Sequence, residues 1–154
     1  MKIDVRRASA IDAPLIARHN GAMAQEIEQL ELDQQRLLAA ANAVIEDESK
    51  GFYLVAEDEH RVVGQLMITY EWSDWRNGVF WWIQSVYVDP AYRGRGVYTS
   101  LHTAIVEQAK TAGDVCGIRL YVEKSNENAQ RSYRRLGMSR TAYDMYEVDF
   151  VLER

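Results

Sequence analysis

Tyr87-Val88-Asp89-Pro90-Ala91-Tyr92-Arg93-Gly94-Arg95-Gly96 is the stretch of sequence on which the predicted fold depends. Residues 79–88 predict a strand, and the apolar spacing after Gly96 predicts a helix to about residue 112. A helix N-terminus presents backbone N–H groups without intrahelical partners, so a glycine-rich turn before it is typical of an anion site. Gly94 and Gly96 let the backbone approach a ligand, and Arg93 and Arg95 make the turn basic. The stretch therefore predicts a site for a phosphorylated ligand.

Two common phosphate-binding motifs are not matched by this turn. The nucleotide P-loop requires a Lys after its last glycine, and none follows Gly96. The dinucleotide motif Gly-x-Gly-x-x-Gly requires a third glycine where this chain has Thr99. Taken alone, the turn is also compatible with a solvated start of a helix.

The remaining sequence predicts strands and helices on both sides of this stretch. Helical spacing of apolar residues covers about residues 9–27 and 33–47, and a polar-aromatic loop covers 71–78. Predicted strands cover residues 3–7, 52–57, 62–70, 79–88, 117–123, 139–143 and 145–151, and another helix covers 126–136. The order β-α-α-β-β-β-α-β-α-β-β implies an α/β (α+β) fold with a mixed sheet. The unit of strand 79–88, helix and strand 117–123 predicts a parallel crossover.

Length and charge limit the classes of function. The chain has 154 residues, which fits a single domain over residues 1–154, and a net charge of −5, from 18 Lys and Arg against 23 Asp and Glu. An acidic chain repels phosphate backbones and anionic membranes, so no nucleic-acid and no membrane partner is expected. The N-terminus lacks a signal peptide, and no run approaches the ~20 apolar residues of a membrane span. We therefore expect a cytoplasmic protein.

Cysteine and histidine predict neither a disulfide framework nor a metal site. Cys116 is the single cysteine, so disulfide scaffolds and cysteine-rich zinc sites are excluded. His19, His60 and His102 are scattered without the spacing of metal ligands. No metal cofactor is expected.

Two motifs together resemble the GCN5-related N-acetyltransferase (GNAT) family. The stretch quoted first is similar to the family's CoA-binding segment, in which a strand ending in Val-x-Pro precedes Gln/Arg-x-x-Gly-x-Gly/Ala. A second stretch, Asn126-Glu127-Asn128-Ala129-Gln130-Arg131-Ser132-Tyr133-Arg134-Arg135-Leu136-Gly137-Met138, resembles the family motif Asn-x-x-Ala-x-x-x-Tyr-x-x-x-Gly-Phe. Their order, with a predicted strand between them, is more specific than either motif alone. The resemblance spans essentially the whole chain and implies a mostly antiparallel central sheet of six to seven strands flanked by helices.

The resemblance implies which residues bind acetyl-CoA as acyl donor. The backbone of Val86, Tyr87 and Val88 would pair with the pantetheine arm like an added strand, and Asn126 would contact its amides or cap the following helix. Backbone N–H groups of the glycine turn and the helix start would hold the pyrophosphate, and they belong to Arg93, Gly94, Arg95, Gly96, Val97, Tyr98 and Thr99. Tyr98 stands where the motif has Gly or Ala, so its side chain must point away from the phosphates or reshape the pocket.

Tyr133 has a chemical role to fill in such a reaction. The leaving group is a CoA thiolate, and a phenol with a pKa near ~10 remains protonated at neutral pH and can donate to the sulfur. The family uses this helix tyrosine in that way. The alternative is a core tyrosine that covers the sheet.

The acceptor side requires a base, because an amine with a pKa near ~10.4 is protonated at neutral pH. Candidate carboxylates are Glu71, Asp74, Glu26 and Glu28, of which Glu71 is favoured because it directly follows an apolar strand. The alternative is that all four are ordinary surface residues.

Aromatic residues crowd the same part of the chain. All four tryptophans, Trp72, Trp75, Trp81 and Trp82, lie within eleven residues and are able to form a wall that receives a cation. We expect one of Trp81 and Trp82 to be core, and strand alternation puts Trp81, Ile83, Ser85 and Tyr87 on one face and Trp82, Gln84 and Val86 on the other. The predicted acceptor residues are Glu26, Trp72, Asp74 and Gln84.

These observations favour an acetyl-CoA-dependent N-acetyltransferase that acts on a primary amine of a small molecule or peptide, by direct transfer in a ternary complex. The alternative is a non-catalytic acyl-CoA sensor or interaction module of the same fold. A toxin-like transferase acting on aminoacyl-tRNA is disfavoured by the charge of −5. The resemblance is also compatible with a homodimer.

Overall fold

The computed structural model describes residues 1–153. Contacts divide the chain into two compact units, Met1–Tyr121 and Val122–Arg154. A single domain over residues 1–154 stays a prediction.

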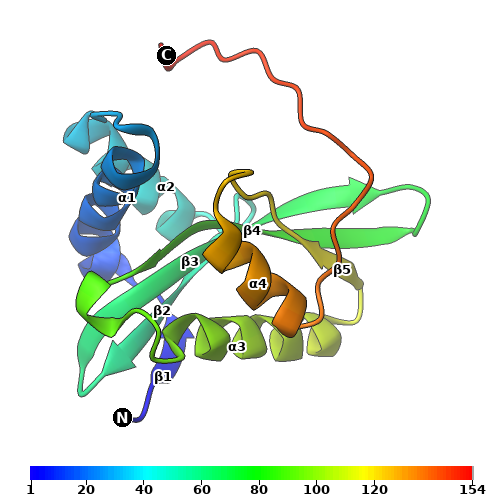
Figure 1. Ribbon diagram of the computed structural model, residues 1–154, viewed down its shortest axis with the longest axis horizontal. Coiled ribbons are helices and arrows are strands. Elements are labelled where there is room, and N and C mark those ends of the chain that lie inside the picture. Colours follow the sequence, from blue (N-terminus) through cyan, green and yellow to red (C-terminus); the bar gives the residue numbers. More distant parts are fainter. Residues whose placement is uncertain (154) are drawn as a thin grey trace. The chain divides into compact units, whose positions relative to one another are not determined.

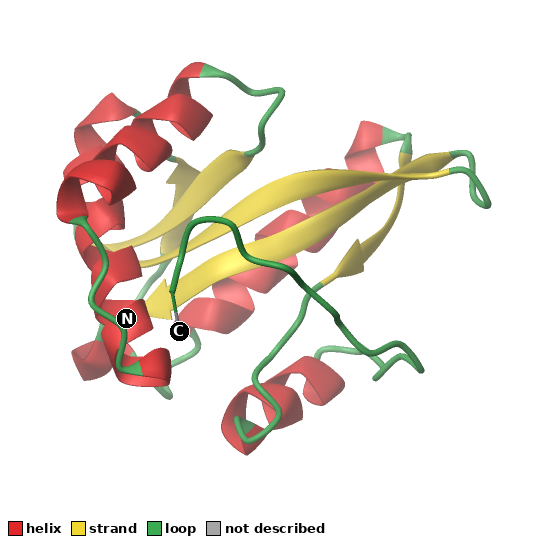
Figure 2. Cartoon of the chain, turned by 90° about the horizontal axis from the view of Figure 1, so that it is seen from above, coloured by secondary structure: helices red, strands yellow, loops and turns green. Residues whose placement is uncertain are grey.

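The first unit contains a five-stranded sheet in which the strands follow each other in sequence order, β1-β2-β3-β4-β5 (Figures 1 and 2). The strands are β1 (Asp4–Arg7), β2 (Phe52–Asp58), β3 (Arg61–Ser73), β4 (Gly78–Val88) and β5 (Val115–Arg119). All neighbours are antiparallel except β4 and β5, which are parallel and joined through a helix. The mixed α/β class and the parallel crossover are confirmed.

Helices cover both faces of this sheet. They are α1 (Ala13–Glu28), α2 (Gln34–Glu46) and α3 (Val97–Ala112), with short 3₁₀ turns η1 (Ala10–Asp12) and η2 (Pro90–Tyr92) before α1 and α3. Alternate residues of β2 face opposite ways: Leu54 packs in a core with Leu101 and Ile105 of α3, whereas Val55 packs with residues of α1 and α2, among them Ile16. The period-2 pattern of β2 therefore places α3 on one face and the α1–α2 pair on the other.

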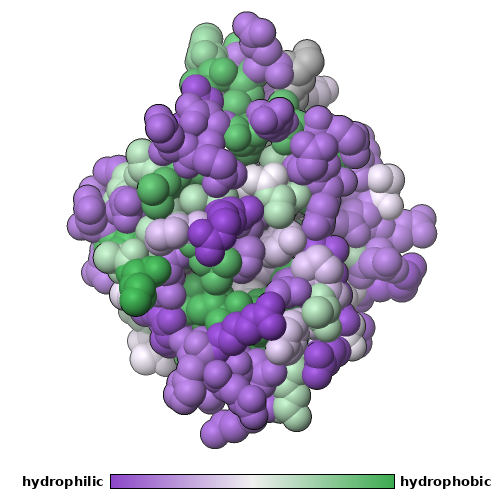
Figure 3. Space-filling view, turned by 90° about the vertical axis from the view of Figure 1, so that its left-hand side faces the viewer, coloured by the Kyte–Doolittle hydropathy of each residue, from purple (hydrophilic) through white to green (hydrophobic). Residues whose placement is uncertain are grey.

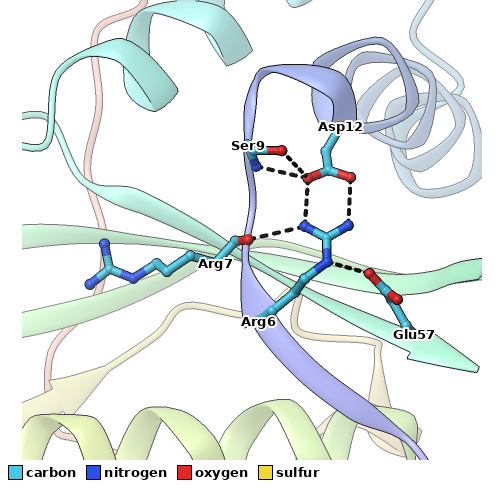
Figure 4. Close-up of polar contacts among 5 residues, drawn as sticks. All are labelled: Arg6, Arg7, Ser9, Asp12 and Glu57. Carbon is cyan, nitrogen blue, oxygen red and sulfur yellow. Dashed lines mark hydrogen bonds and ion pairs between the residues drawn. The ribbon is translucent and has the colours of Figure 1, made fainter. Parts of the chain in front are cut away.

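An ion-pair network fixes the start of α1 to β1 (Figure 4). The Arg6 guanidinium donates from Nη1 to Oδ2 of Asp12 at 2.8 Å and from Nη2 to Oδ1 at 2.9 Å, and its Nε contacts Glu57. The Ser9 backbone N–H donates to the same Oδ2 at 2.8 Å. These hydrogen bonds, chiefly those from Arg6, lower the pKa of the buried Asp12.

A bulge interrupts β4 and corrects the predicted face assignment. Met67 pairs with Gln84, but Gln65 pairs with Tyr87, so β4 has one residue more than β3, and Ser85 has a φ of 51°. Beyond the bulge Tyr87 lies against α1, whereas alternation had predicted that it shares the face of Trp81 and Ile83. Sequence alternation misses this because a left-handed Ser85 leaves no pattern in the residue types.

The hairpin between β3 and β4 is longer than predicted. Residues 71–73, expected in a loop, continue β3, because Glu71 and Trp72 pair with Phe80 and Val79 across the ladder. Only residues 74–77 form the turn. Glu71 is therefore a strand residue, and its place in the ladder determines the face of the sheet on which its side chain lies.

The second unit contains one helix, α4 (Glu127–Arg135), and an extended C-terminal segment. The strands predicted at residues 139–143 and 145–151 are wrong, because no described residue beyond Arg119 belongs to a strand, and β5 begins at Val115 rather than at residue 117. The sheet thus has five strands instead of six or seven. Apolar alternation alone does not form a strand, which also needs a neighbour for its N–H and C=O groups. The apolar side chains of this segment are exposed, including Tyr146 at 95% and Phe150 at 93%.

The surface seen in Figure 3 is mainly polar, with apolar residues in separate patches. Within residues 1–153, the helices are all too short or too polar to cross a membrane.

Candidate functional site

The turn before α3 has the geometry of an open anion site. Gly94 and Gly96 have φ values of 75° and 84°, and a Cβ at either position would meet nothing within 4 Å. Gly96 is the N-cap and has no side chain that could cap the helix, and the Ser100 N–H donates to its carbonyl at 3.1 Å. The backbone amides of Val97 and Thr99 precede this first helical bond, so they lack helical acceptors. The glycine turn therefore leaves a helix N-terminus accessible to an anion.

The two arginines of the turn already have partners. Arg93 donates from Nη2 to Oε2 of Glu26 at 2.9 Å and from Nε to the carbonyl of Val88 at 2.9 Å. The Arg95 guanidinium lies 4.8 Å from the centre of the Tyr92 ring. Arg93 therefore connects the turn to α1 and to the end of β4, and Glu26 neutralises part of the charge of the turn.

Tyr98 does not have to fill the anion site. Its ring packs against the core under α3, and its hydroxyl lies 3.2 Å from Nδ1 of the buried His102. A partner one helical turn further along α3 accommodates the bulky residue at a position where the family motif has Gly or Ala.

One edge of β4 has no strand partner beside this turn. β5 pairs with β4 only at residues 79–82, and no other described strand continues the ladder along residues 83–88 on that side. Val86, Tyr87 and Val88 lie on this stretch, immediately before the turn. An unpaired strand edge offers backbone N–H and C=O groups to an extended ligand.

Glu71 is held by two donors on the α1–α2 face of the sheet. Its Oε1 accepts from Nη1 of Arg119 at 2.7 Å and from Nε1 of Trp82 at 3.3 Å. The Arg119 guanidinium also lies 3.7 Å from the centre of the Phe80 ring. Glu71 is thus a charge-paired carboxylate, and one oxygen accepts both of these hydrogen bonds.

The other predicted acceptor residues are spread over the unit. Gln84 lies on the same face as Glu71 and donates from Nε2 to Oγ1 of Thr69 at 2.6 Å. Trp72 points to the opposite face and is exposed, and Asp74 is exposed in the hairpin turn. Glu26 lies at the far end of the sheet, where it accepts from the Tyr87 hydroxyl at 3.3 Å. The structure therefore groups Glu71 with Gln84, and Glu26 with the turn.

One of the paired tryptophans is core, as predicted. Trp81 is buried and meets Phe52 edge-on, with ring centres 5.3 Å apart. Trp82 is partly exposed, and its ring lies 6.1 Å from that of Tyr121. Only Trp82 is available to a ligand on the Glu71 face.

Asn126 and Tyr133 belong to the second unit. The Asn126 Oδ1 accepts from the Ala129 N–H at 3.2 Å, which is the N-cap role. Tyr133 lies on α4, and burial raises the pKa of its phenol, so that it is protonated at neutral pH. The chemistry of a proton donor is therefore available on this helix.

A polar cluster that sequence reasoning missed lies beneath the β4 bulge. Gln65 is fully buried in the middle of β3 and contacts His19 and Asn20 of α1 and the carbonyl of Ser85. The signal was present, because Gln65 is polar within the apolar stretch 62–70 and a buried amide requires partners. The sequence assigns His19 no function, because its only expected property is the lack of metal-ligand spacing.

In the described part of the chain, no three His, Cys, Asp or Glu residues are grouped so that they could hold a metal ion. The expectation of no metal cofactor stays a prediction.

The sequence matches the family model described as Acetyltransferase (GNAT) family over residues 18–138. A possible acetyltransferase from Clostridium difficile 630 has 43% sequence identity and a TM-score of 0.88, over 99% of this chain and 100% of that chain. A predicted acetyltransferase with acetyl-CoA from Clostridium acetobutylicum has 19% identity and a TM-score of 0.77, over 97% of each chain. AAC(6')-Iy in complex with the bisubstrate analogue CoA-S-monomethyl-acetylneamine has 14% identity and a TM-score of 0.76, over 97% of this chain and 99% of that chain. These last two share the fold. No curated protein matches the sequence.

Proposed function

The chain belongs to the acetyltransferase (GNAT) family, and on that premise we propose that it transfers the acetyl group of acetyl-CoA to a primary amine of a small molecule or peptide. The observation that carries the proposal is the free edge of β4 at residues 83–88, followed directly by the glycine turn and the N-terminus of α3. An extended amide-containing chain that ends in a diphosphate matches this order of features.

The residues of the first unit fit the acyl donor. The edge formed by Val86, Tyr87 and Val88 suits the two amides of pantetheine, which pair with backbone groups as a strand would. The open space at Gly94 and Gly96 and the helix N-terminus behind them suit a pyrophosphate. Acetyl-CoA would supply an acetyl group activated as a thioester.

The chain's own groups position the reactants and move protons. The amine nitrogen forms a bond to the acetyl carbon as the carbon–sulfur bond breaks, and the sulfur leaves with the bonding electron pair. We assign Tyr133 as the donor of the proton that the sulfur takes up, because its phenol is protonated at neutral pH. Positioning supplies much of the acceleration in a direct transfer of this kind.

Glu71 stays a candidate base on the acceptor side. Its Oε1 is occupied by Arg119 and Trp82, so Oε2 is the atom available to an ammonium group. The face around it, with Trp82 and Gln84, offers aromatic and amide contacts to an acceptor.

Turnover over a panel of amines tests the proposal. CoA-thiol release should require both acetyl-CoA and an amine, and calorimetry should show binding of acetyl-CoA in the absence of amine. Binding without turnover for any amine would favour the non-catalytic acyl-CoA sensor, and absence of binding would exclude both functions.

A homodimer remains part of the proposal, because the exposed apolar side chains of residues 143–151 are typical of a surface that a second copy covers. Light scattering at increasing concentration tests it. A mass equal to one chain at all concentrations would exclude it.

A further inference from the structure

The buried amide of Gln65 has a defined orientation. The Ser85 carbonyl lies 3.2 Å from one end of the amide, and a backbone carbonyl only accepts hydrogen bonds. That end must therefore be the NH₂ group, which also donates to Oδ1 of Asn20 at 3.0 Å. The amide oxygen then points at His19.

This orientation determines the tautomer of His19. The Gln65 Oε1 lies 3.0 Å from Nδ1 of His19, and since the oxygen only accepts, Nδ1 must carry the proton. A neutral imidazole has one N–H, so its Nε2 has a lone pair. Gln65 donates one hydrogen bond to the Ser85 carbonyl and accepts another from Nδ1 of His19. Together these two hydrogen bonds leave Nε2 of His19 as a proton acceptor on α1.

His19 lies beside the strand that is proposed to bind the acyl donor. Its ring packs on the ring of Tyr87 with centres 4.7 Å apart and an angle of 32°. Tyr87 is the middle residue of the proposed pantetheine edge, just beyond the bulge. The imidazole therefore adjoins the part of β4 where the bulge turns the chain towards α1.

Burial and the charged groups around His19 together keep its ring uncharged at neutral pH. Burial is the main influence and lowers the pKa of His19, while the Gln65 hydrogen bond opposes it. Arg18 on α1 also lowers this pKa, and Asp89 at the end of β4 raises it. Glu26 and Arg93 form an ion pair beyond Tyr87. At neutral pH the ring is therefore an acceptor.

We propose that His19 is the base that takes the proton from the acceptor ammonium group, with Gln65 as the positioning residue that holds its Nε2 unprotonated. The inference rests on the proposed function. The proton passes from the ammonium nitrogen to Nε2, directly or through one water, and gives an imidazolium and an uncharged amine. The amine then attacks the acetyl carbon, and the imidazolium returns its proton to solvent.

His19 suits this task better than Glu71 because the hydrogen bonds around it leave its acceptor atom unused. One oxygen of the Glu71 carboxylate, Oε1, already accepts hydrogen bonds from Arg119 and Trp82. The hydrogen bond between His19 and Gln65 is made through Nδ1, so it does not use the lone pair of Nε2. A base is more effective when its lone pair is not already used.

The first test compares the pH dependence of kcat in the wild type, His19→Gln and Gln65→Glu. In the wild type, kcat should fall at acid pH as His19 becomes protonated. His19→Gln should lower kcat about 100-fold or more. In this variant the decrease of kcat with falling pH should occur near the pKa of the amine itself, at ~10. Gln65→Glu should raise the pKa of His19, because a carboxylate stabilises imidazolium, and should shift the fall to higher pH.

The second test does not depend on activity. Long-range proton–nitrogen NMR correlations of the free protein should show His19 protonated at Nδ1, and Gln65→Met should populate the other tautomer. His60→Gln is the matched control, because His60 lies in the turn after β2, and it should change neither the tautomer of His19 nor the pH profile. Melting temperatures establish which variants are folded.

The outcomes separate the two proposals. If the wild type neither binds acetyl-CoA nor turns over, the proposed function fails and the base assignment falls with it. If the wild type turns over, a His19→Gln variant with an unchanged kcat profile would overturn the assignment, and so would a wild-type His19 protonated at Nε2. If His19→Gln does not fold, a pH profile of kcat that is unshifted in Gln65→Glu would overturn the assignment of His19 as the base.

Discussion

Arg93 and Glu26 form an ion pair with Nη2 and Oε2 2.9 Å apart, which joins the turn before α3 to the last helical turns of α1. Both side chains are partly exposed, so the pair itself adds little stability. Its effect is on the anion site, because the carboxylate competes with a ligand phosphate for the same guanidinium.

Removal of that carboxylate should therefore strengthen binding of the acyl donor. We expect Glu26→Gln to lower the Kd of acetyl-CoA about two- to fivefold in titration calorimetry at low salt, with a smaller effect at high salt. In an Arg93→Ala background, Glu26→Gln should leave the Kd nearly unchanged. Weaker binding in Glu26→Gln would mean that the carboxylate orients Arg93 for the ligand.

Gly96→Ala separates backbone strain from ligand approach. Gly96 has a φ of 84° and open space around it, so the added methyl group should cost ~1–2 kcal/mol of unfolding free energy through the left-handed backbone. If the turn binds the donor, the Kd of acetyl-CoA should rise as well. Gly113→Ala is the matched control, since Gly113 has a φ of 82° and equal space at the other end of α3. It should show a similar loss of stability and an unchanged Kd.

Asp12→Asn should destabilise the fold in a pH-dependent way. The folded state lowers the pKa of Asp12, so its contribution is present above the ordinary value of ~3.9 and is lost as pH falls through the folded value. We expect a loss of about 2–4 kcal/mol at pH 7 in denaturant titrations. The difference from wild type should shrink below pH ~4. Asp4→Asn removes an exposed carboxylate from β1, the strand that contains Arg6, and should have little effect at either pH.

Tyr133→Phe tests the proton donor. Loss of the hydroxyl should lower kcat by about 10²–10⁴-fold and leave the Kd of acetyl-CoA and the melting temperature nearly unchanged. The measurement is a pair of single-turnover and calorimetric experiments. Equal loss of turnover and affinity would assign Tyr133 to binding or packing.

The fold could be predicted from the sequence as far as local patterns determine it. The glycine turn, its helix and the α1–α2 pair have residue spacing that acts within a few positions. The helix α2 also has a local cap, because the Asp33 side chain accepts from the Gln35 N–H at 2.9 Å. Residues 139–151 have an equally clear strand pattern and form no strand. Whether these residues form a strand depends on a neighbouring strand to pair with, which the local sequence does not specify.

The candidate site was predictable where a motif positions the backbone. Residues 86–88 lie on a strand edge and the turn lies at a helix N-terminus, and binding of a ligand at either place stays a prediction. The Glu71–Arg119 pair and the His19–Gln65 contact join residues about 45 or more positions apart, so no spacing rule detects them. The left-handed Ser85 likewise has its carbonyl bound by Gln65, which is 20 positions away in the sequence.

The exposed tail has a consequence for the behaviour of the protein in concentrated solution. Between residues 143 and 151, six apolar side chains are 63% to 95% exposed on an alternating segment, which is able to nucleate intermolecular β-pairing. The net charge of −5 keeps separate molecules apart by mutual repulsion. Mild acid removes that repulsion, so precipitation should set in while the rest of the molecule is still folded, and a chain shortened before residue 143 should stay clear under the same conditions.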